Sequence, residues 1–131
     1  MIETEYKQLM EMTAFYRLKD RVRQQFPDAQ VKDTVQVNDY YDTADGFLRS
    51  QDITLRIRHT EEGLWLQSKA HFAGTEAFRR SEEHGCLIAS VPDSLRLAGF
   101  PGRRFLRQGN LVTRRTRFLL ENGLRLDFDV N

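Results

Sequence analysis

Charged side chains at alternate positions near the N-terminus are the part of this chain best suited to chemistry. Glu3, Glu5 and Lys7 are separated by single Thr and Tyr residues. On a β-strand, successive side chains point to opposite faces, so two carboxylates and an ammonium would share one face. Such a face can be the solvated side of an antiparallel sheet. It can also hold a metal ion beside a phosphate, because carboxylate oxygens suit hard divalent cations.

The same two-residue spacing of charged residues returns on later segments, where the intervening residues are mostly apolar. These groups are Arg56 and Arg58, Lys69, Arg80 and Glu82, Arg115 and Arg117, and Asp127 and Asp129. Either each face is solvated separately, or the sheet curls into a barrel whose polar faces point inward. Cations in such a lumen would bind a polyphosphate through charge-assisted hydrogen bonds. The carboxylates would then be ligands of Mg²⁺ or Mn²⁺, which bridge to phosphates.

The segments that carry these residues have strand signals, and turn or helix signals lie between them. Alternation predicts strands over 2–9, 31–41, 52–59, 64–72, 76–84, 110–121 and 124–130. Apolar residues at helical spacing predict a helix over 14–26, with Thr13 as its N-cap, and a short second helix is expected within 93–99. Asn122-Gly123 predicts a hairpin turn. The expected fold class is therefore α+β with a largely antiparallel sheet.

Composition sets limits on the class of protein. A chain of 131 residues with 40% hydrophobic and 30% charged residues predicts one folded domain over 1–131. A net charge of +1 gives no field that would attract DNA or an acidic membrane, and no apolar run is long enough to span a bilayer. Cys86 is the single cysteine, which excludes an internal disulfide and favours a cytoplasmic protein. The charged N-terminus does not resemble a signal peptide.

Several short motifs, in this order, resemble those of the CYTH superfamily of triphosphate tunnel proteins. The similarity is greatest to its short bacterial members assigned as triphosphatases. The motifs are Glu3-Thr4-Glu5-Tyr6-Lys7, Tyr40-Tyr41-Asp42-Thr43, Leu55-Arg56-Ile57-Arg58, Lys69, Thr113-Arg114-Arg115 and Leu124-Arg125-Leu126-Asp127. Each motif alone is weak, but together they cover nearly the whole chain.

The resemblance implies an antiparallel, barrel-like tunnel, flanked by one or two helices, that binds a triphosphate and a divalent metal. It assigns metal binding to Glu3 and Glu5, and Asp127 and Asp129 are further candidates. It assigns phosphate binding to Lys7, Arg56, Arg58, Lys69, Arg80, Arg115 and Arg117. Lys69 is also the candidate catalytic residue, because the matching lysine of family members has been proposed to activate water. The expected activity is metal-dependent hydrolysis of a small triphosphate: inorganic triphosphate, thiamine triphosphate or a nucleoside triphosphate.

The sequence departs from the family pattern at its end. Family members continue through a further hairpin whose glutamate completes the metal site, whereas this sequence stops at Asn131. The expected tunnel is therefore incomplete at the C-terminus. An open sheet edge invites another strand, so a homodimer is one expectation and weak or absent hydrolysis is the other.

Other functions remain open. A non-catalytic polyphosphate- or nucleotide-binding module and a class IV adenylate cyclase would use the same charges. A nucleic-acid-binding sheet is disfavoured, because Arg56 and Arg58 alternate with aliphatic rather than aromatic residues. Trp65 either packs near the tunnel mouth or stacks on a base or thiazole ring of the substrate.

Overall fold

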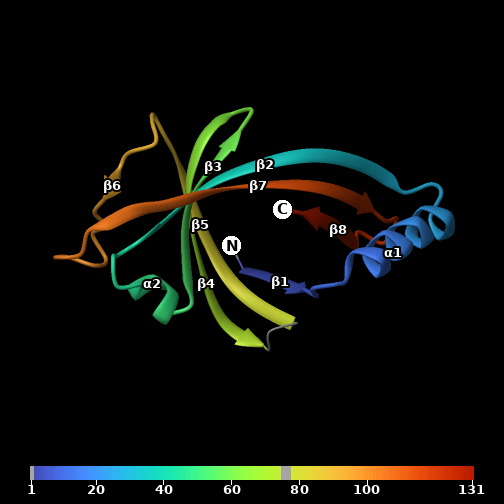
Figure 1. Ribbon diagram of the computed structural model, residues 1–131, viewed down its shortest axis with the longest axis horizontal. Helices are drawn as coiled ribbons and strands as arrows, with labels where there is room; N and C mark the ends of the chain where they lie inside the picture. The colour runs from blue at the N-terminus through green and yellow to red at the C-terminus, as the bar shows by residue number, and fades with distance from the viewer. Residues whose placement is uncertain (1, 75–77) are drawn as a thin grey trace. The chain divides into compact units, whose positions relative to one another are not determined.

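The fold is a sheet of mostly antiparallel strands accompanied by two helices (Figure 1). It is known from a computed structural model that describes residues 2–74 and 78–131, and the side chains of 5–72 and 80–131. The strands are β1 (Ile2–Tyr6), β2 (Gln30–Asp42), β3 (Ile53–Thr60), β4 (Gly63–Gly74), β5 (Phe78–Ile88), β6 (Ser94–Leu95), β7 (Phe105–Leu119) and β8 (Arg125–Val130). The helices are α1 (Met12–Gln25) and α2 (Phe47–Ser50).

The eight strands form one sheet in the order β1-β5-β4-β3-β2-β7-β6, and β8 pairs with β7. Within this described order β1 and β6 are the two ends, so the sheet is open rather than closed on itself. The predicted α+β class with a largely antiparallel sheet is confirmed. In the part of the chain that the structure describes, no helix is long and apolar enough to cross a membrane.

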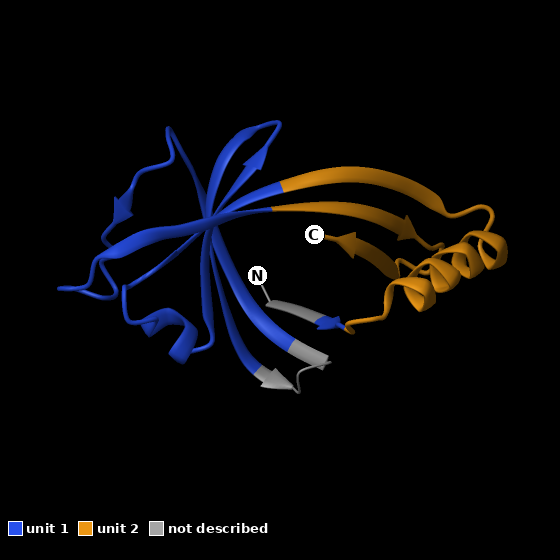
Figure 2. Ribbon diagram, in the orientation of Figure 1, with its two compact units in different colours: residues 1–7, 37–111 blue, residues 8–36, 112–131 orange. Residues whose placement is uncertain are grey.

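The chain divides into two compact units, coloured separately in Figure 2. Unit 1 contains residues 1–7 and 37–111, and unit 2 contains residues 8–36 and 112–131. The boundaries fall inside β2 and β7, so each of these long strands contributes to both units. The expectation of one domain over 1–131 stays a prediction, because the two units have separate cores.

The core of unit 1 lies on one face of the sheet. It is formed by the buried residues Tyr41, Leu48, Leu55, Ile57 and Phe105. Leu55 and Ile57 alternate along β3 with Arg56 and Arg58, so the arginines belong to the opposite face, as the alternation predicts.

The core of unit 2 is aromatic and is built between α1 and the ends of β7 and β8. Val22, Phe118, Leu120 and Phe128 are buried there. The ring of Phe128 contacts Phe118 edge-on, with ring centroids 5.6 Å apart. Helix α1 therefore packs on the sheet through a few large side chains.

Asp42 and Thr43, which belong to the Tyr40–Thr43 motif, cap a short helix that the sequence did not predict. Asp42 Oδ1 accepts hydrogen bonds from the backbone N–H of Thr43 at 2.7 Å and of Leu48 at 2.8 Å. Thr43 Oγ1 accepts from Phe47 N at 2.9 Å. These side chains satisfy the free N–H groups at the start of α2, and the adjoining Gly46 takes the left-handed φ of +74°.

Other details of the secondary structure also differ from the predictions. Helix α1 is capped by the Glu11 carboxylate, which accepts from Thr13 N and Ala14 N, so Thr13 itself is not the cap. Strand β1 ends at Tyr6, and β7 starts at Phe105. The helix expected within 93–99 is absent from these described residues, where Ser94–Leu95 form the short strand β6 instead.

Candidate functional site

Strands β3 and β4 place a row of polar side chains on the face of unit 1 opposite its core. Arg56 is the register partner of Gln67, and its Nε donates to Gln67 Oε1 at 3.2 Å. Arg58 is the partner of Trp65 on β4, and its Nε donates to Asn38 Oδ1 of β2 at 3.1 Å. Both of these hydrogen-bond partners are neutral amides, and they orient the two guanidinium groups on this face.

Lys69 continues the same row and meets a carboxylate from β1. Its partner on β3 is Thr54, which has the same phase as Arg56. Lys69 Nζ lies 3.6 Å from Glu5 Oε1, and the two side chains are 13% and 33% exposed. Because β5 separates β4 from β1 in the sheet, this contact requires the sheet to curl toward its polar face. Arg56, Arg58, Lys69 and Glu5 therefore share a partly enclosed surface.

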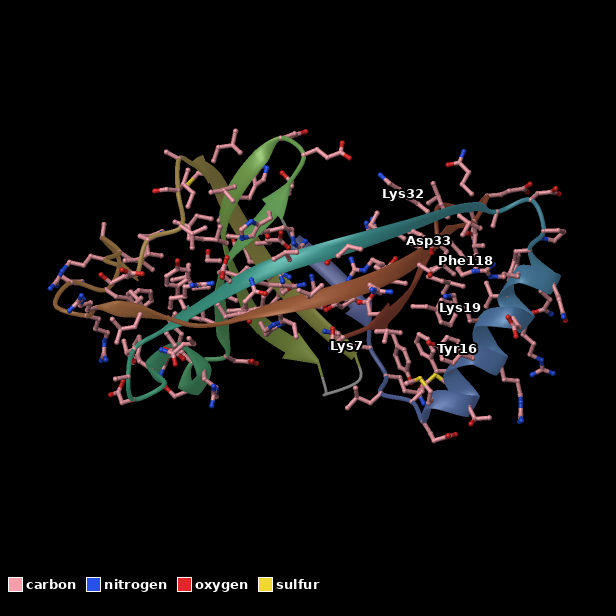
Figure 3. The ribbon with its side chains drawn as sticks, turned by 45° about the horizontal axis from the view of Figure 1, so that its top comes forward. Lys7, Tyr16, Lys19, Lys32, Asp33 and Phe118 are labelled. Carbon is pink, nitrogen blue, oxygen red and sulfur yellow. The ribbon has the colours of Figure 1, made fainter. Side chains whose placement is uncertain are left out.

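Two further predicted site residues, Glu3 and Lys7, lie in or next to β1. Glu3 belongs to β1 and is paired with Ser81 of β5, but its side chain lies outside the described residues. Lys7 directly follows the end of β1 and is exposed (Figure 3). The two-residue phase of Glu3 and Glu5 on one strand is thus present, whereas Lys7 stands one residue past the paired segment.

Arg80 and Glu82 do not join this row. Arg80 is the register partner of Thr4, and its guanidinium lies over the Phe72 ring at 5.3 Å. Glu82 is the partner of Ala70, and its Oε1 is hydrogen-bonded to His84 Nε2 at 3.1 Å. Both residues have the phase opposite to Glu5 and Lys69. The sequence-based grouping of Arg80 with Arg56 and Arg58 therefore does not hold in the structure.

Glu83 is the residue that sequence analysis missed on this face. It pairs with Lys69 across β4 and β5 and is partly buried. Residues 79 and 80 are both Arg, and residues 82 and 83 are both Glu, so like charges occupy adjacent positions in the sequence of β5. The sequence therefore gives no signal for the phase of this strand, which is set by its pairing.

Unit 2 carries a separate ladder of arginine–aspartate pairs across β7 and β8. Arg115 binds Asp129 through Nε at 2.7 Å and Nη2 at 2.8 Å. Arg117 binds Asp127 in the same bidentate way, at 2.7 and 3.0 Å, and Arg115 Nη1 also lies 3.5 Å from Asp127. The structure thus brings the predicted phosphate-binding and metal-binding residues of this unit together as ion pairs.

The environment of Asp127 favours its charged form. Burial alone would raise its pKa, but the hydrogen bond from Arg117 and the charges of Arg115, Arg117 and Arg125 outweigh that effect and hold the pKa below its usual value. The carboxylate is therefore ionised at neutral pH and already has cationic partners.

A groove of about 620 Å³ opens in unit 2 between α1 and the strands β2, β7 and β8. Tyr16 and Lys19 line it from α1, and Asp33 lines it from β2 (Figure 3). Asp33 accepts a hydrogen bond from Thr116 Oγ1 at 2.7 Å, which ties β2 to β7. This groove combines one acid with the cations Lys19, Arg114 and Arg115.

A buried carboxylate that the sequence did not single out lies on the core face of unit 1. The Asp39 side chain is only 2% exposed, and it binds Arg107 at 2.7 Å and His59 at 2.6 Å. Asn110 donates to it as well, at 3.3 Å. Burial would raise the pKa of Asp39, but the hydrogen bonds from His59, Arg107 and Asn110 outweigh burial and lower it. This cluster joins β2, β3 and β7.

Carboxylate oxygens suited to Mg²⁺ or Mn²⁺ are present, although they are not gathered into a complete site. Within the described side chains, no three His, Cys, Asp or Glu residues lie close enough together to hold a metal ion. Glu5 offers one partly exposed carboxylate beside Lys69. Such a ligand fits a hard cation that takes its remaining ligands from phosphate and water.

The comparisons with known proteins agree on the type of domain. A family model described as CYTH domain matches residues 1–131. No curated protein sequence matches this chain. One similar structure is HpAC1 from Hippeastrum, a candidate adenylyl cyclase described as revealing a dominant triphosphatase activity. It is 24% identical with a TM-score of 0.67, over 98% of this chain and 71% of that one.

Another similar structure is a candidate adenylate cyclase from Bacillus halodurans. It is 18% identical with a TM-score of 0.58, over 99% of this chain and 72% of that one. At these identities the likeness concerns the fold, which is the tunnel type expected from the motifs.

Proposed function

This chain belongs to the CYTH domain family, and from that premise we propose that it hydrolyses a small triphosphate with the help of a divalent metal. The observation that supports this most directly is the polar face of unit 1. There Arg56, Arg58 and Lys69 lie on the same face as Glu5, opposite the apolar core. A concave row of cations is suited to a linear polyanion, and a nearby carboxylate is suited to the metal that accompanies it.

In this proposal the two arginines hold the phosphate oxygens. The Nε of each arginine donates to a neutral amide, Gln67 for Arg56 and Asn38 for Arg58, and a guanidinium oriented in this way is suited to bind two phosphate oxygens. Glu5, together with Glu3, is the proposed metal-binding group of this unit. A divalent cation bound there would neutralise charge on the phosphate oxygens and so favour attack at phosphorus.

The reaction requires water to attack the terminal phosphorus while the bond from that phosphorus to the bridging oxygen breaks. The bridging oxygen leaves with the electron pair, and the products are orthophosphate and the shortened chain. Lys69 is the proposed catalytic residue, because its ammonium is largely buried and lies beside Glu5. From this place it can bind the attacked phosphate and orient water.

In unit 2, Arg115 and Arg117 are proposed to bind phosphate, and Asp127 and Asp129 to exchange between arginine and metal. The support is their bidentate pairing, which shows that both arginines are arranged to bind planar pairs of oxygen atoms. Phosphate offers oxygen atoms at similar spacing.

The test is release of orthophosphate from tripolyphosphate, ATP and thiamine triphosphate, with and without Mg²⁺ or Mn²⁺. We expect metal-dependent release that is lost in Lys69→Ala. Formation of cyclic AMP and diphosphate from ATP would identify a cyclase instead. Binding of all three ligands without product would identify a binding module, and no binding at all would refute the proposal. Light scattering of the same samples tests the expected homodimer.

A further inference from the structure

The single tryptophan of the chain lies on the polar face of unit 1 rather than in its core. Trp65 is the register partner of Arg58 on β3 and of Leu87 on β5. It precedes Lys69 by four residues on β4, so the two side chains stand roughly 13 Å apart along the strand. Trp65 therefore marks the opposite end of the cationic row from the Lys69–Glu5 contact.

The indole of Trp65 lies beside a glycine on the neighbouring strand. A Cβ added to Gly85 would meet Gln67 Cγ tightly at 3.2 Å, whereas its distance of 3.6 Å to Trp65 Cε3 would be ordinary van der Waals contact. The benzene half of the indole approaches the backbone of β5 at this position, as expected for a ring that leans across the sheet.

A second apolar side chain lies next to the Trp65 indole on this face. Leu87, directly across from Trp65, is 54% exposed, and Trp65 itself is partly exposed. The core residues Leu55 and Ile57 lie on the opposite face of the sheet and cannot cover this surface. Trp65 and Leu87 thus form a small exposed apolar strip, and Arg58 lies beside the strip.

We propose that this Trp65–Leu87 strip is a platform for a planar ring of the substrate, which rests on the triphosphate function proposed above. A ligand whose phosphates contact Lys69, Arg56 and Arg58 would carry its organic group past Arg58, which is where the indole lies. Planar aromatic rings stack on tryptophan, and a base bound in this way gains affinity largely independently of its hydrogen-bonding pattern. The substrate class is therefore an organic triphosphate with an aromatic ring, such as a nucleoside triphosphate, rather than inorganic tripolyphosphate.

The single tryptophan makes the test direct, because its fluorescence reports on this strip alone. The protein is titrated with ATP, thiamine triphosphate and tripolyphosphate, and both emission and affinity are recorded. We expect ATP or thiamine triphosphate to quench the emission and to bind roughly tenfold more tightly than tripolyphosphate. Trp65→Ala should remove that preference and leave the affinity for tripolyphosphate within about twofold, and Trp65→Phe should retain part of the preference.

Phe72→Ala is the matched control, because Phe72 is an exposed aromatic residue of the same strand that contacts Arg80 rather than Arg58. It should leave the preference unchanged. Equal affinities for ATP, thiamine triphosphate and tripolyphosphate in the unaltered protein would overturn the platform while the triphosphate function stands. Equal losses for all three ligands in Trp65→Ala would also overturn it, since Trp65 would then only support the sheet. Tripolyphosphate affinity that does not depend on Arg58 would instead contradict the function itself.

Discussion

Arg58 and Arg80 lie on opposite faces of the same curled sheet. Arg58 is four residues from Thr54 on β3, and Thr54 pairs with Lys69, so Arg58 faces the same side as Lys69. Arg80 on β5 pairs with Thr4, which neighbours Glu5 on β1 and therefore faces the other side. The two residues have the same charge and belong to the same unit. They therefore form a matched pair that separates binding at the polar face from general attraction of an anion by positive charge.

Arg58→Ala should weaken binding of tripolyphosphate by roughly 10- to 100-fold, because about 1.5–3 kcal/mol is typical for hydrogen bonds to a charged group. The rise in melting temperature caused by tripolyphosphate should shrink accordingly, since a ligand that binds only the folded state stabilises it by mass action. Arg80→Ala should leave the rise unchanged. Equal loss in both variants would mean that the ligand is attracted by net charge and not held on the polar face.

Glu5→Gln tests the metal proposal in unit 1. The substitution keeps the shape of the side chain but removes the negative charge that lies 3.6 Å from Lys69. We expect the Mn²⁺ concentration required for half-maximal phosphate release to rise, while affinity for tripolyphosphate in metal-free buffer is kept or increased. An unchanged Mn²⁺ requirement would remove Glu5 from the metal site. Glu82→Gln, on the opposite face of β5, is the control and should alter neither measurement.

The buried carboxylate of unit 1 should matter more for stability than the ion pairs of unit 2. Asp39→Ala leaves Arg107, His59 and Asn110 without their shared acceptor, and because Arg107 and His59 are themselves 46% and 38% exposed, water can replace part of what is lost, so we expect a cost of about 1–3 kcal/mol. Asp127→Ala removes a carboxylate that is 22% rather than 2% exposed and should cost about 1 kcal/mol or less. Urea unfolding of the two variants measures both values. A larger loss in the Asp127 variant would contradict this ranking.

The lowered pKa of Asp39 also predicts how stability depends on pH. An unfolded aspartate has a pKa of about 3.9, and the folded value lies below it, so the folded state favours the ionised form. The contribution is therefore present in full above the unfolded pKa and is lost as pH falls through the folded pKa. As the pH falls below about 4, the pKa of an unfolded aspartate, unfolding experiments should show a steeper loss in the unaltered protein than in Asp39→Asn. Parallel curves would show that Asp39 is not the group responsible.

How far the sequence predicts this site depends on whether a strand has charges on one face or on both. Apolar and polar residues alternate strictly from Ile53 to Arg58, so this pattern alone predicts which side of β3 is polar, and the structure agrees. On β5 like charges are adjacent, with arginine at 79 and 80 and glutamate at 82 and 83, so an alternating pattern does not show which phase faces the polar side. The pairing of β5 with β1 and β4 sets that phase and places Arg80 opposite to Glu5 and Lys69.

Contacts between segments that are far apart in the sequence could not be predicted either. Asp39 looks like any polar residue of a strand, and its partners Arg107 and Asn110 are found only through the pairing of β2 with β7. Asp42 caps the four-residue helix α2, which is too short to give a periodic signal in the sequence. Local chemistry is thus predictable where the acceptor and donor are close in sequence.

The arginine–aspartate ladder of unit 2 gives a prediction whose sign depends on the metal. Asp129 occupies two N–H groups of Arg115, which a phosphate would need. In metal-free buffer, Asp129→Asn should therefore bind tripolyphosphate more tightly, by up to roughly tenfold, because the competing negative charge is gone. If Asp129 also helps to hold a divalent cation, the same variant should bind tripolyphosphate more weakly than the unaltered protein once Mn²⁺ is added.

Asp33→Asn is the control for this reversal. It removes one negative charge from the same unit, but Asp33 accepts a hydrogen bond from Thr116 rather than pairing with an arginine of the ladder. It should change affinity little in either buffer, because the effect of a more distant charge is screened by salt. Isothermal titration in both buffers measures the change. An Asp129→Asn variant that behaves like Asp33→Asn would show that the ladder only joins β7 to β8 and takes no part in binding phosphate.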